Sequence, residues 1–281
     1  MPTTGWPQST TPGRESARKG ASGEAGDRVS LVADSRHADR LIASPNFNER
    51  RGVAAPDLLI LHYTGMETAE AAVERLMATG SDVSCHYVVF EDGRIAQMVA
   101  ESERAWHAGV ASWGGASDIN SRSIGIEIVN CGHDHGYPDF PGIQIESVTA
   151  LCKDICVRHA LKPQHVLAHS DVAPGRKRDP GEKFPWALLA AKGIGHWVSP
   201  EEAGVAAGPV PGDSGPEVAA LKAALADYGY GISRDDVFDA TAFDVVVAFQ
   251  RHFRPERVDG IADRSTVTTL QRLLAALRPT V

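Results

Sequence analysis

The sequence predicts an α/β (α+β) fold, in which a central mixed sheet flanked by helices is followed by a small three-helix domain. Short apolar runs rich in branched residues alternate with segments of helical periodicity, a pattern typical of a domain built round one sheet. An Asp-Gly hairpin signal joins two of these runs. A stretch dominated by Glu, Gly, Ala and Pro at residues 200–216 then separates them from three short amphipathic segments.

The 281 residues exceed the usual size of one compact domain, and their composition divides them into four segments. Residues 1–43 are expected to form a disordered tail, because they open with a long run rich in Ser, Thr, Gly and Pro. Residues 44–198 are expected to form the sheet-containing domain. Residues 199–211 would then be a linker and 212–281 the helical domain.

Five segments have the length and the apolar content of buried strands. These strands are expected at residues 58–64, 84–90, 94–99, 123–129 and 165–169. The sequence Glu-Asp-Gly at 91–93 predicts a hairpin between the second and the third. Helices are expected in the sheet-containing domain at residues 68–79, 144–159 and 185–192, and in the helical domain at 218–228, 242–253 and 265–274. Thr68 is the expected N-cap of the first helix.

Composition and charge exclude several classes of protein. Hydrophobic residues make up 43% of the chain and charged residues 23%, as in an ordinary folded protein. The net charge of -8, without a basic stripe, argues against a nucleic-acid partner and against attraction to anionic membranes. No apolar run approaches the roughly 18 to 20 residues of a membrane helix, so a soluble enzyme is expected, and a monomer.

The four cysteines do not suggest a disulfide framework in a chain of this length. They are Cys85, Cys131, Cys152 and Cys156. Cys152 and Cys156 have helical spacing rather than that of a CxxC motif. Buried free thiols are therefore expected at these positions.

Three residues have the type and position that a catalytic zinc ion requires, which is three protein ligands with a fourth position left open. His62 and His169 each end a predicted strand, and Asp179 follows in a loop rich in Pro and Gly. These side chains could converge at one end of the sheet. On spacing alone, structural histidines at strand ends remain an alternative.

Two further charged residues lie beside these candidates. Glu127 interrupts an otherwise apolar strand, and a carboxylate there is costly to bury without a partner or a task. The alternative is a salt-bridged or solvent-facing glutamate. Lys177 precedes Asp179 by two residues, so that both would point to one side of an extended loop. A solvated lysine is its alternative, since Arg176 and Arg178 flank it.

Four ordered motifs carry a resemblance to a known family. They are LHYT at 61–64, AWHAG at 105–109, SIGIEIVN at 123–130 and AHSDVAPGRKRDPG at 168–181. Residues 44–197 resemble the zinc-dependent N-acetylmuramoyl-L-alanine amidases of the amidase_2 type, relatives of phage lysozyme-type amidases and of peptidoglycan recognition proteins. The C-terminal segment resembles a three-helix peptidoglycan-binding domain through residues 212–225, 248–255 and 259–263.

The resemblance implies His62, His169 and Asp179 as zinc ligands, with Glu127 and Lys177 as catalytic groups. It implies hydrolysis of the amide between the muramyl lactyl group and L-alanine in peptidoglycan or anhydro-muropeptides. Glu127 would act as general base and then general acid, and Lys177 would stabilise the oxyanion. The alternatives are a non-catalytic recognition protein and a metallopeptidase of the stem peptide. Because Asp179 completes the ligand set, catalysis is expected.

Trp106, His107 and Asn130 are candidates for contacts with the sugar or the stem peptide, although Trp106 also suits a core position. Some relatives carry a catalytic tyrosine just before the histidine at position 86, where this chain has Cys85. A catalytic role for this position is therefore in doubt, and Glu127 must contribute more.

His133 and His135 form an HxH pair in a Gly-rich loop, and they are the competing metal ligands.

Location gives conflicting signals. A cell-wall-binding module favours the periplasm or the exterior. The N-terminal segment has no apolar region typical of a secretory signal, which favours the cytoplasm and the recycling of anhydro-muropeptides. A cytoplasmic protein is expected. The alternative is a periplasmic or secreted protein exported by a route that the sequence does not reveal.

Overall fold

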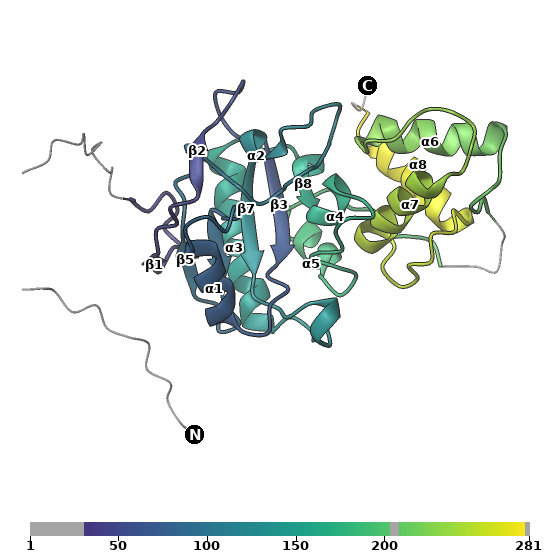
Figure 1. Cartoon of the computed structure of the whole chain (residues 1–281). Coiled ribbons are helices and arrows are strands. Elements are labelled where there is room, and N and C mark those ends of the chain that lie inside the picture. The colour runs from purple at the N-terminus through teal and green to yellow at the C-terminus, as the bar shows by residue number, and fades with distance from the viewer. Residues whose placement is uncertain (1–30, 203–207, 279–281) are drawn as a thin grey trace, which may run out of the picture. The chain divides into compact units, whose positions relative to one another are not determined.

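The computed structural model describes residues 31–202 and 208–278 (Figure 1). We call residues 31–198 the sheet part and residues 208–278 the helical part. In the described residues, none of the helices is long and apolar enough to cross a bilayer.

The predicted central mixed sheet with flanking helices is confirmed. Six strands lie in the order β1-β5-β4-β7-β3-β8, and only the neighbours β4 and β5 run antiparallel. The strands are β1 (Arg40–Leu41), β3 (Leu58–Tyr63), β4 (Tyr87–Val89), β5 (Ile95–Gln97), β7 (Ser123–Ile128) and β8 (Val166–Ala168). Two further strands, β2 (Phe47–Glu49) and β6 (Glu103–Ala105), form a small antiparallel sheet. The hairpin signal at 91–93 joins β4 to β5 as expected.

Six helices form where periodicity predicts them, whereas the two short helices α2 (Ile119–Arg122) and α4 (His169–Val172) were not expected, and α4 begins at His169, which was predicted to end a strand. The other helices of the sheet part are α1 (Ala69–Met77), α3 (Gly142–Arg158) and α5 (Trp186–Ala191). Those of the helical part are α6 (Pro216–Tyr228), α7 (Ala240–Phe253) and α8 (Arg264–Ala276). Thr68 caps α1, because its hydroxyl accepts a hydrogen bond from the Ala71 amide at 3.1 Å. The caps of α7 and α8 are aspartates, Asp239 and Asp263.

The alternation of side chains along β3 and β7 gives the sheet two different faces. Leu59 and Leu61 of β3 share one apolar cluster with Ile124, Ile126 and Ile128 of β7 and with the apolar residues of α3. The residues between them point to the opposite face. That face carries His62 and Glu127, which are register partners on the neighbouring strands β3 and β7.

The start of the fold corrects one expectation. The predicted tail of residues 1–43 overlaps the folded chain, since Arg40–Leu41 pair in parallel with β5 and the Ser35 hydroxyl donates to Asp154 at 2.8 Å. A strand of two residues on a sheet edge leaves no hydrophobic pattern, so composition alone concealed it. Residues 1–30 of the expected tail lie outside the described residues.

The expectation of buried thiols holds for only two of the four cysteines. Cys85 and Cys152 are fully buried, whereas Cys131 and Cys156 are half-buried. All four are free thiols, as expected.

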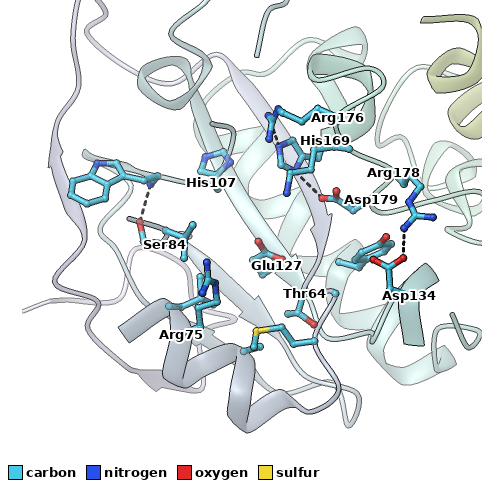
Figure 2. A pocket seen from close by; sticks show the side chains of 18 residues that line it. Thr64, Arg75, Ser84, His107, Glu127, Asp134, His169, Arg176, Arg178 and Asp179 are labelled. Atoms are coloured by element: carbon cyan, nitrogen blue, oxygen red, sulfur yellow. Dashed lines mark hydrogen bonds and ion pairs between the residues drawn. The ribbon is translucent and has the colours of Figure 1, made fainter. Parts of the chain in front are cut away.

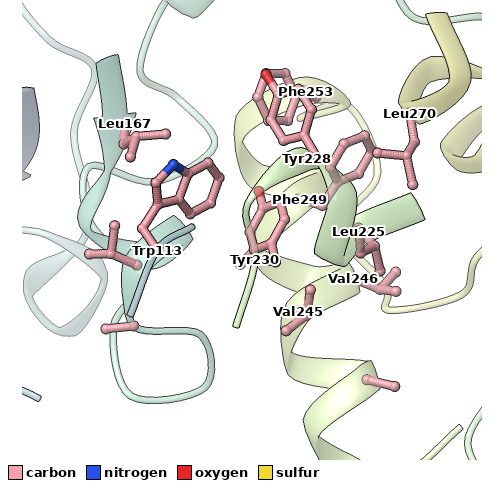
Figure 3. Close-up of a cluster of buried hydrophobic side chains, with 14 of the residues drawn as sticks. Trp113, Leu167, Leu225, Tyr228, Tyr230, Val245, Val246, Phe249, Phe253 and Leu270 are labelled. Atoms are coloured by element: carbon pink, nitrogen blue, oxygen red, sulfur yellow. The ribbon is translucent and has the colours of Figure 1, made fainter. Parts of the chain in front are cut away.

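The helical part shares a hydrophobic core with the sheet part (Figure 3). Trp113 and Leu167 of the sheet part lie in one buried cluster with residues such as Tyr230, Phe249 and Phe253 of the helical part. Trp113 meets the ring of Tyr230 edge-on, with the ring centroids 4.9 Å apart. The helical part is therefore packed against the sheet part through apolar side chains.

Candidate active site

Three buried ligand atoms from three segments converge at the carboxyl ends of β3 and β8. Leu61 of β3 pairs with Ala168 of β8, so the next residues, His62 and His169, emerge side by side. The Nδ1 atoms of the two histidines are 2.9 Å apart. Oδ2 of Asp179 lies 3.1 Å from the first and 2.9 Å from the second. The structure thus brings together the three residues predicted as metal ligands, in a group that could hold a metal ion.

The atoms behind His169 fix which of its nitrogens faces the group. Nε2 of His169 lies 3.1 Å from the carbonyl oxygen of Ala108. A carbonyl oxygen can only accept, and it lies nearer to Nε2 than the Arg176 guanidinium does at 3.4 Å, so Nε2 carries the hydrogen and Nδ1 presents its lone pair. This orients the imidazole as metal-binding histidines are oriented.

A longer chain of hydrogen bonds fixes His62 in the same way. The Ser123 hydroxyl donates to the carbonyl of Ile119 at 2.7 Å, so it must accept from Nε2 of His107, 3.2 Å away. Nδ1 of His107 therefore accepts from Nε2 of His62 at 3.0 Å, and Nδ1 of His62 keeps its lone pair. Burial also lowers the pKa of His62 to about 4, which favours the neutral ring.

The donor set fits a zinc ion. Two imidazole lone pairs and a carboxylate oxygen meet with no hydrogen between them, and such a group is stabilised by a cation. Ligands of tetrahedral zinc at 2.0 to 2.1 Å lie about 3.3 Å from one another, close to the separations of these atoms. Two histidines and one carboxylate are also a ligand set of catalytic zinc sites.

Gly125 makes room for the ring behind His62. A Cβ atom on this residue would lie 2.4 Å from the His107 imidazole. Because that distance is far inside van der Waals contact, any other residue would displace His107 from His62. A glycine is therefore required at position 125 to leave space for the His107 ring, and not to form a turn.

Glu127 lies beside the ligand group on β7. Its Oε2 atom is buried, with no hydrogen-bond partner among the described residues. Burial, together with the charge of Asp179, raises the pKa of Glu127 well above its usual value, and the nearby Lys177 opposes the shift. A carboxyl with a raised pKa and an unpaired oxygen is suited to accept and release a proton.

A cavity of about 350 Å³ opens over this group (Figure 2). Figure 2 shows Glu127, His169 and Asp179 facing it together. Lys177 and the predicted substrate contacts Trp106 and His107 also line it. Trp106 is half-buried and its indole donates to Asn48 at 3.0 Å, while His107 is 8% exposed.

The structure does not bring Asn130 to the cavity. Its side-chain amide donates to the carbonyl of Pro138 and accepts from the amide of Gly132, both at 2.9 Å. These bonds hold the loop after β7, so a substrate contact by Asn130 has no support in this arrangement.

The other candidates lie apart from the ligand group. Cys85 is fully buried, and burial raises the pKa of its thiol, so the geometry offers it no acid–base role. His133 pairs with Glu182 at 3.1 Å, and His135 lies 3.5 Å from Glu67. The HxH pair thus binds two different carboxylates and is not part of the metal-binding group.

Several residues that line the cavity were not predicted as site residues, and Tyr63 and Arg176 are two of them. The hydroxyl of Tyr63 lies 3.0 Å from Nδ1 of His133, so the pair His133–Glu182 orients this phenol at the cavity wall. Arg176 donates to the carbonyl of Val110 at 3.0 Å and closes one side of the cavity. The sequence signal for Tyr63 was its position next to His62 at a strand end.

Comparisons with known proteins agree with this arrangement. A family model described as N-acetylmuramoyl-L-alanine amidase matches residues 52–182, and one described as a putative peptidoglycan binding domain matches residues 214–277. The chain is 38% identical over 230 residues to the N-acetylmuramoyl-L-alanine amidase AmiD of Escherichia coli strain K12, covering 77% of this chain and 82% of the relative. It is 33% identical over 166 residues to the 1,6-anhydro-N-acetylmuramyl-L-alanine amidase AmpD of the same organism, covering 53% and 88%.

Solved structures extend the similarity to the fold. AmiD from E. coli, in complex with the substrate anhydro-N-acetylmuramic acid-L-Ala-D-gamma-Glu-L-Lys, matches with a TM-score of 0.69 and 34% identity over 83% of this chain and 98% of that one. AmpDh3 from Pseudomonas aeruginosa, in complex with anhydromuramic pentapeptide, matches with a TM-score of 0.69 and 32% identity over 89% and 100%. The chain therefore belongs to the N-acetylmuramoyl-L-alanine amidase family.

Proposed function

We propose that this amidase uses a zinc ion held by His62, His169 and Asp179 to hydrolyse the amide between the muramyl lactyl group and L-alanine of muropeptides. The observation that carries the proposal is the meeting of three lone-pair donors within 3.1 Å, their tautomers fixed from behind. When bound, zinc supplies Lewis acidity, since it lowers the pKa of water from 15.7 to about 7 and polarises a carbonyl.

Glu127 is the proton carrier in this proposal. Its unpaired Oε2 takes a proton as the attacking water forms the new C–O bond. The same carboxyl returns that proton to the L-alanine nitrogen as the C–N bond breaks. The products are a free lactyl carboxylate and an amine. The raised pKa of Glu127 supports this role, because burial makes its carboxylate a stronger base than an exposed glutamate.

Lys177 stabilises the negative charge that develops on the carbonyl oxygen. It lines the cavity, and its charge reaches both Glu127 and His62. No hydrogen bond or ion pair holds its ammonium group within the described parts of the chain, so the group is free to meet an oxyanion.

The substrate class follows from the cavity and the relatives. We infer anhydro-muropeptides as substrates, since AmiD and AmpDh3 were solved with such molecules. Trp106 at the cavity wall offers an aromatic face to a sugar or a peptide. The helical part, which matches a peptidoglycan-binding family, supports action on larger fragments as well. The monomeric state and the cytoplasmic location remain predictions from the sequence.

The test starts from zinc-free protein, to which zinc is either added or not added. Each sample is then incubated with soluble anhydro-muropeptides and, in parallel, with intact sacculi. Mass spectrometry should detect a lactyl-muramic sugar and an intact stem peptide only in the zinc-loaded samples. Cleavage within the stem peptide would point to a metallopeptidase instead, and binding without cleavage to a recognition protein. A His62→Ala protein that still bound one zinc tightly would remove the proposed ligand set.

A further inference from the structure

A buried carboxylate lies two residues after the proposed ligand His169. Asp171 of α4 is fully buried, and its Oδ2 atom accepts from the backbone amide of Ala168 at 2.8 Å. This bond closes the first turn of α4, and His169 is the first residue of that helix. The position of the His169 backbone therefore depends on how Asp171 is held.

Two side chains of the helical part hold Asp171. The hydroxyl of Tyr230 donates to Oδ1 at 2.7 Å, and Nδ1 of His252 donates to Oδ2 at 2.6 Å. Both side chains are almost fully buried. The His252 ring also stacks on Trp186 of α5, with the centroids 3.8 Å apart. Side chains of the helical part thus reach into the sheet part and contact the turn that carries His169.

The backbone around Tyr230 is shaped for this reach. Gly229 and Gly231 flank it, and a Cβ atom would lie 2.6 Å from the Trp113 ring at the first and 2.1 Å from the Ser112 hydroxyl at the second. The amide of Gly114 donates to the carbonyl of Gly229 at 2.8 Å. The glycines allow the two backbones to approach closely, which delivers the Tyr230 hydroxyl to Asp171.

We propose that Tyr230 and His252 are positioning residues of the metal centre, acting through Asp171 on the turn that presents His169. The helical part then does more than bind cell-wall material, because it completes the support of one metal ligand. This inference rests on the proposed metal site. Groups hydrogen-bonded directly to a metal ligand typically contribute 10- to 100-fold to metal affinity, and because Tyr230 and His252 act one step further out, the lower end of that range is expected.

A matched control lies two residues from Tyr230. The hydroxyl of Tyr228 lies 2.9 Å from Nδ1 of His196, so it also joins the helical part to the sheet part. Tyr228 is as deeply buried as Tyr230, at 5% and 3% exposure. Tyr228→Phe and Tyr230→Phe therefore each remove one phenol hydroxyl from the same interface, and only the second touches Asp171.

The experiment measures zinc affinity of the full chain by competition with a chelator, and the visible spectrum of the cobalt-substituted protein. We expect Tyr230→Phe to bind zinc about tenfold more weakly, with an altered cobalt spectrum, and Tyr228→Phe to match the wild type in both. Melting temperatures should fall by similar amounts in the two variants. Equal zinc affinity in the two variants would overturn the inference.

A second pair of variants tests His252. His252→Asn keeps an N–H group where Nδ1 stands, whereas His252→Leu removes it at similar volume. We expect the Leu variant to lose about tenfold in zinc affinity and the Asn variant to recover most of it. Equal loss in both would mean that the ring packs but does not position. A wild-type chain that binds no zinc would instead refute the proposed metal site itself, and this inference with it.

Discussion

Two clusters of buried polar groups in the sheet part differ in how their charges are balanced. The ligand group of His62, His169 and Asp179 brings one carboxylate against two imidazole lone pairs. In the other cluster the carboxylate of Glu101, 4% exposed, receives hydrogen bonds from Tyr87 at 2.6 Å, His159 at 2.7 Å and Arg158.

This difference in charge balance distinguishes a cluster that stabilises the fold from one that can bind a metal ion and transfer a proton. The Glu101 cluster is complete, because its own chain supplies the donors and a cation. The ligand group is completed only by a cation from outside, and Glu127 beside it keeps an unpaired buried oxygen. A buried carboxylate is thus a poor guide to function by itself, and its partners decide what it does.

Replacing Glu127 or Glu101 by glutamine tests the difference between the two clusters, and the largest effect is expected at Glu127. Glu127→Gln should lower kcat on muropeptides by about 10²- to 10⁴-fold, because the amide cannot carry the proton. Zinc affinity should stay close to wild type. Glu101→Gln is the matched control and should keep kcat/KM. Steady-state kinetics with chelator competition checks both, and wild-type turnover in Glu127→Gln would assign the proton transfer elsewhere.

Lys177→Met should have the next largest effect. Loss of an oxyanion donor costs about 10²- to 10³-fold in kcat. Lys192→Met, at an exposed residue after α5, is the control and should leave kcat unchanged. If both variants turned over alike, the ammonium of Lys177 would be merely solvated, which is the alternative reading of its sequence context.

Gly125→Ala should weaken zinc binding rather than impair proton transfer by Glu127. The added Cβ would displace the His107 ring and free His62 to rotate, so zinc should bind about 10- to 100-fold more weakly. Gly142→Ala, at the start of α3 where a Cβ meets open space, is the control. Chelator competition should separate the two, and equal affinities would show that His107 does not orient His62.

Periodicity placed the candidate ligands, but spacing alone left structural histidines as an alternative, and the family resemblance completed the predicted ligand set. Strand ends located His62 and His169, and breaker residues located Asp179. The sequence could not predict the support behind them. The contact of Asp171 with Tyr230 joins residues 59 positions apart, and no local pattern records such a pair. Asn130 was expected at the substrate because amides suit sugars, yet its loop uses both atoms of the amide.

The short strands were missed for a related reason. Arg40–Leu41 and Phe47–Glu49 are two and three residues long, so an alternation of polar and apolar residues cannot develop. They exist because β5 and β6 offer them unpaired backbone groups. These two strands are stabilised by pairing with neighbouring strands, whereas β3 and β7 can be recognised from their own apolar residues.

Glu101→Gln should have the smallest effect on catalysis but a measurable effect on the free energy of unfolding. Burial raises the pKa of Glu101, but the hydrogen bonds from Arg158, His159 and Tyr87 outweigh it and lower the pKa to about 2. A carboxyl whose pKa is lower in the folded state stabilises the fold at pH values above its unfolded pKa of about 4.5. This stability is lost as the pH falls towards 2. The shift corresponds to about 3 kcal/mol. Denaturant unfolding should therefore show the variant less stable by about that amount at pH 7, with the two curves converging near pH 2. A difference that stays constant from pH 5 to pH 2 would mean that the cluster stabilises by packing and not by its charge.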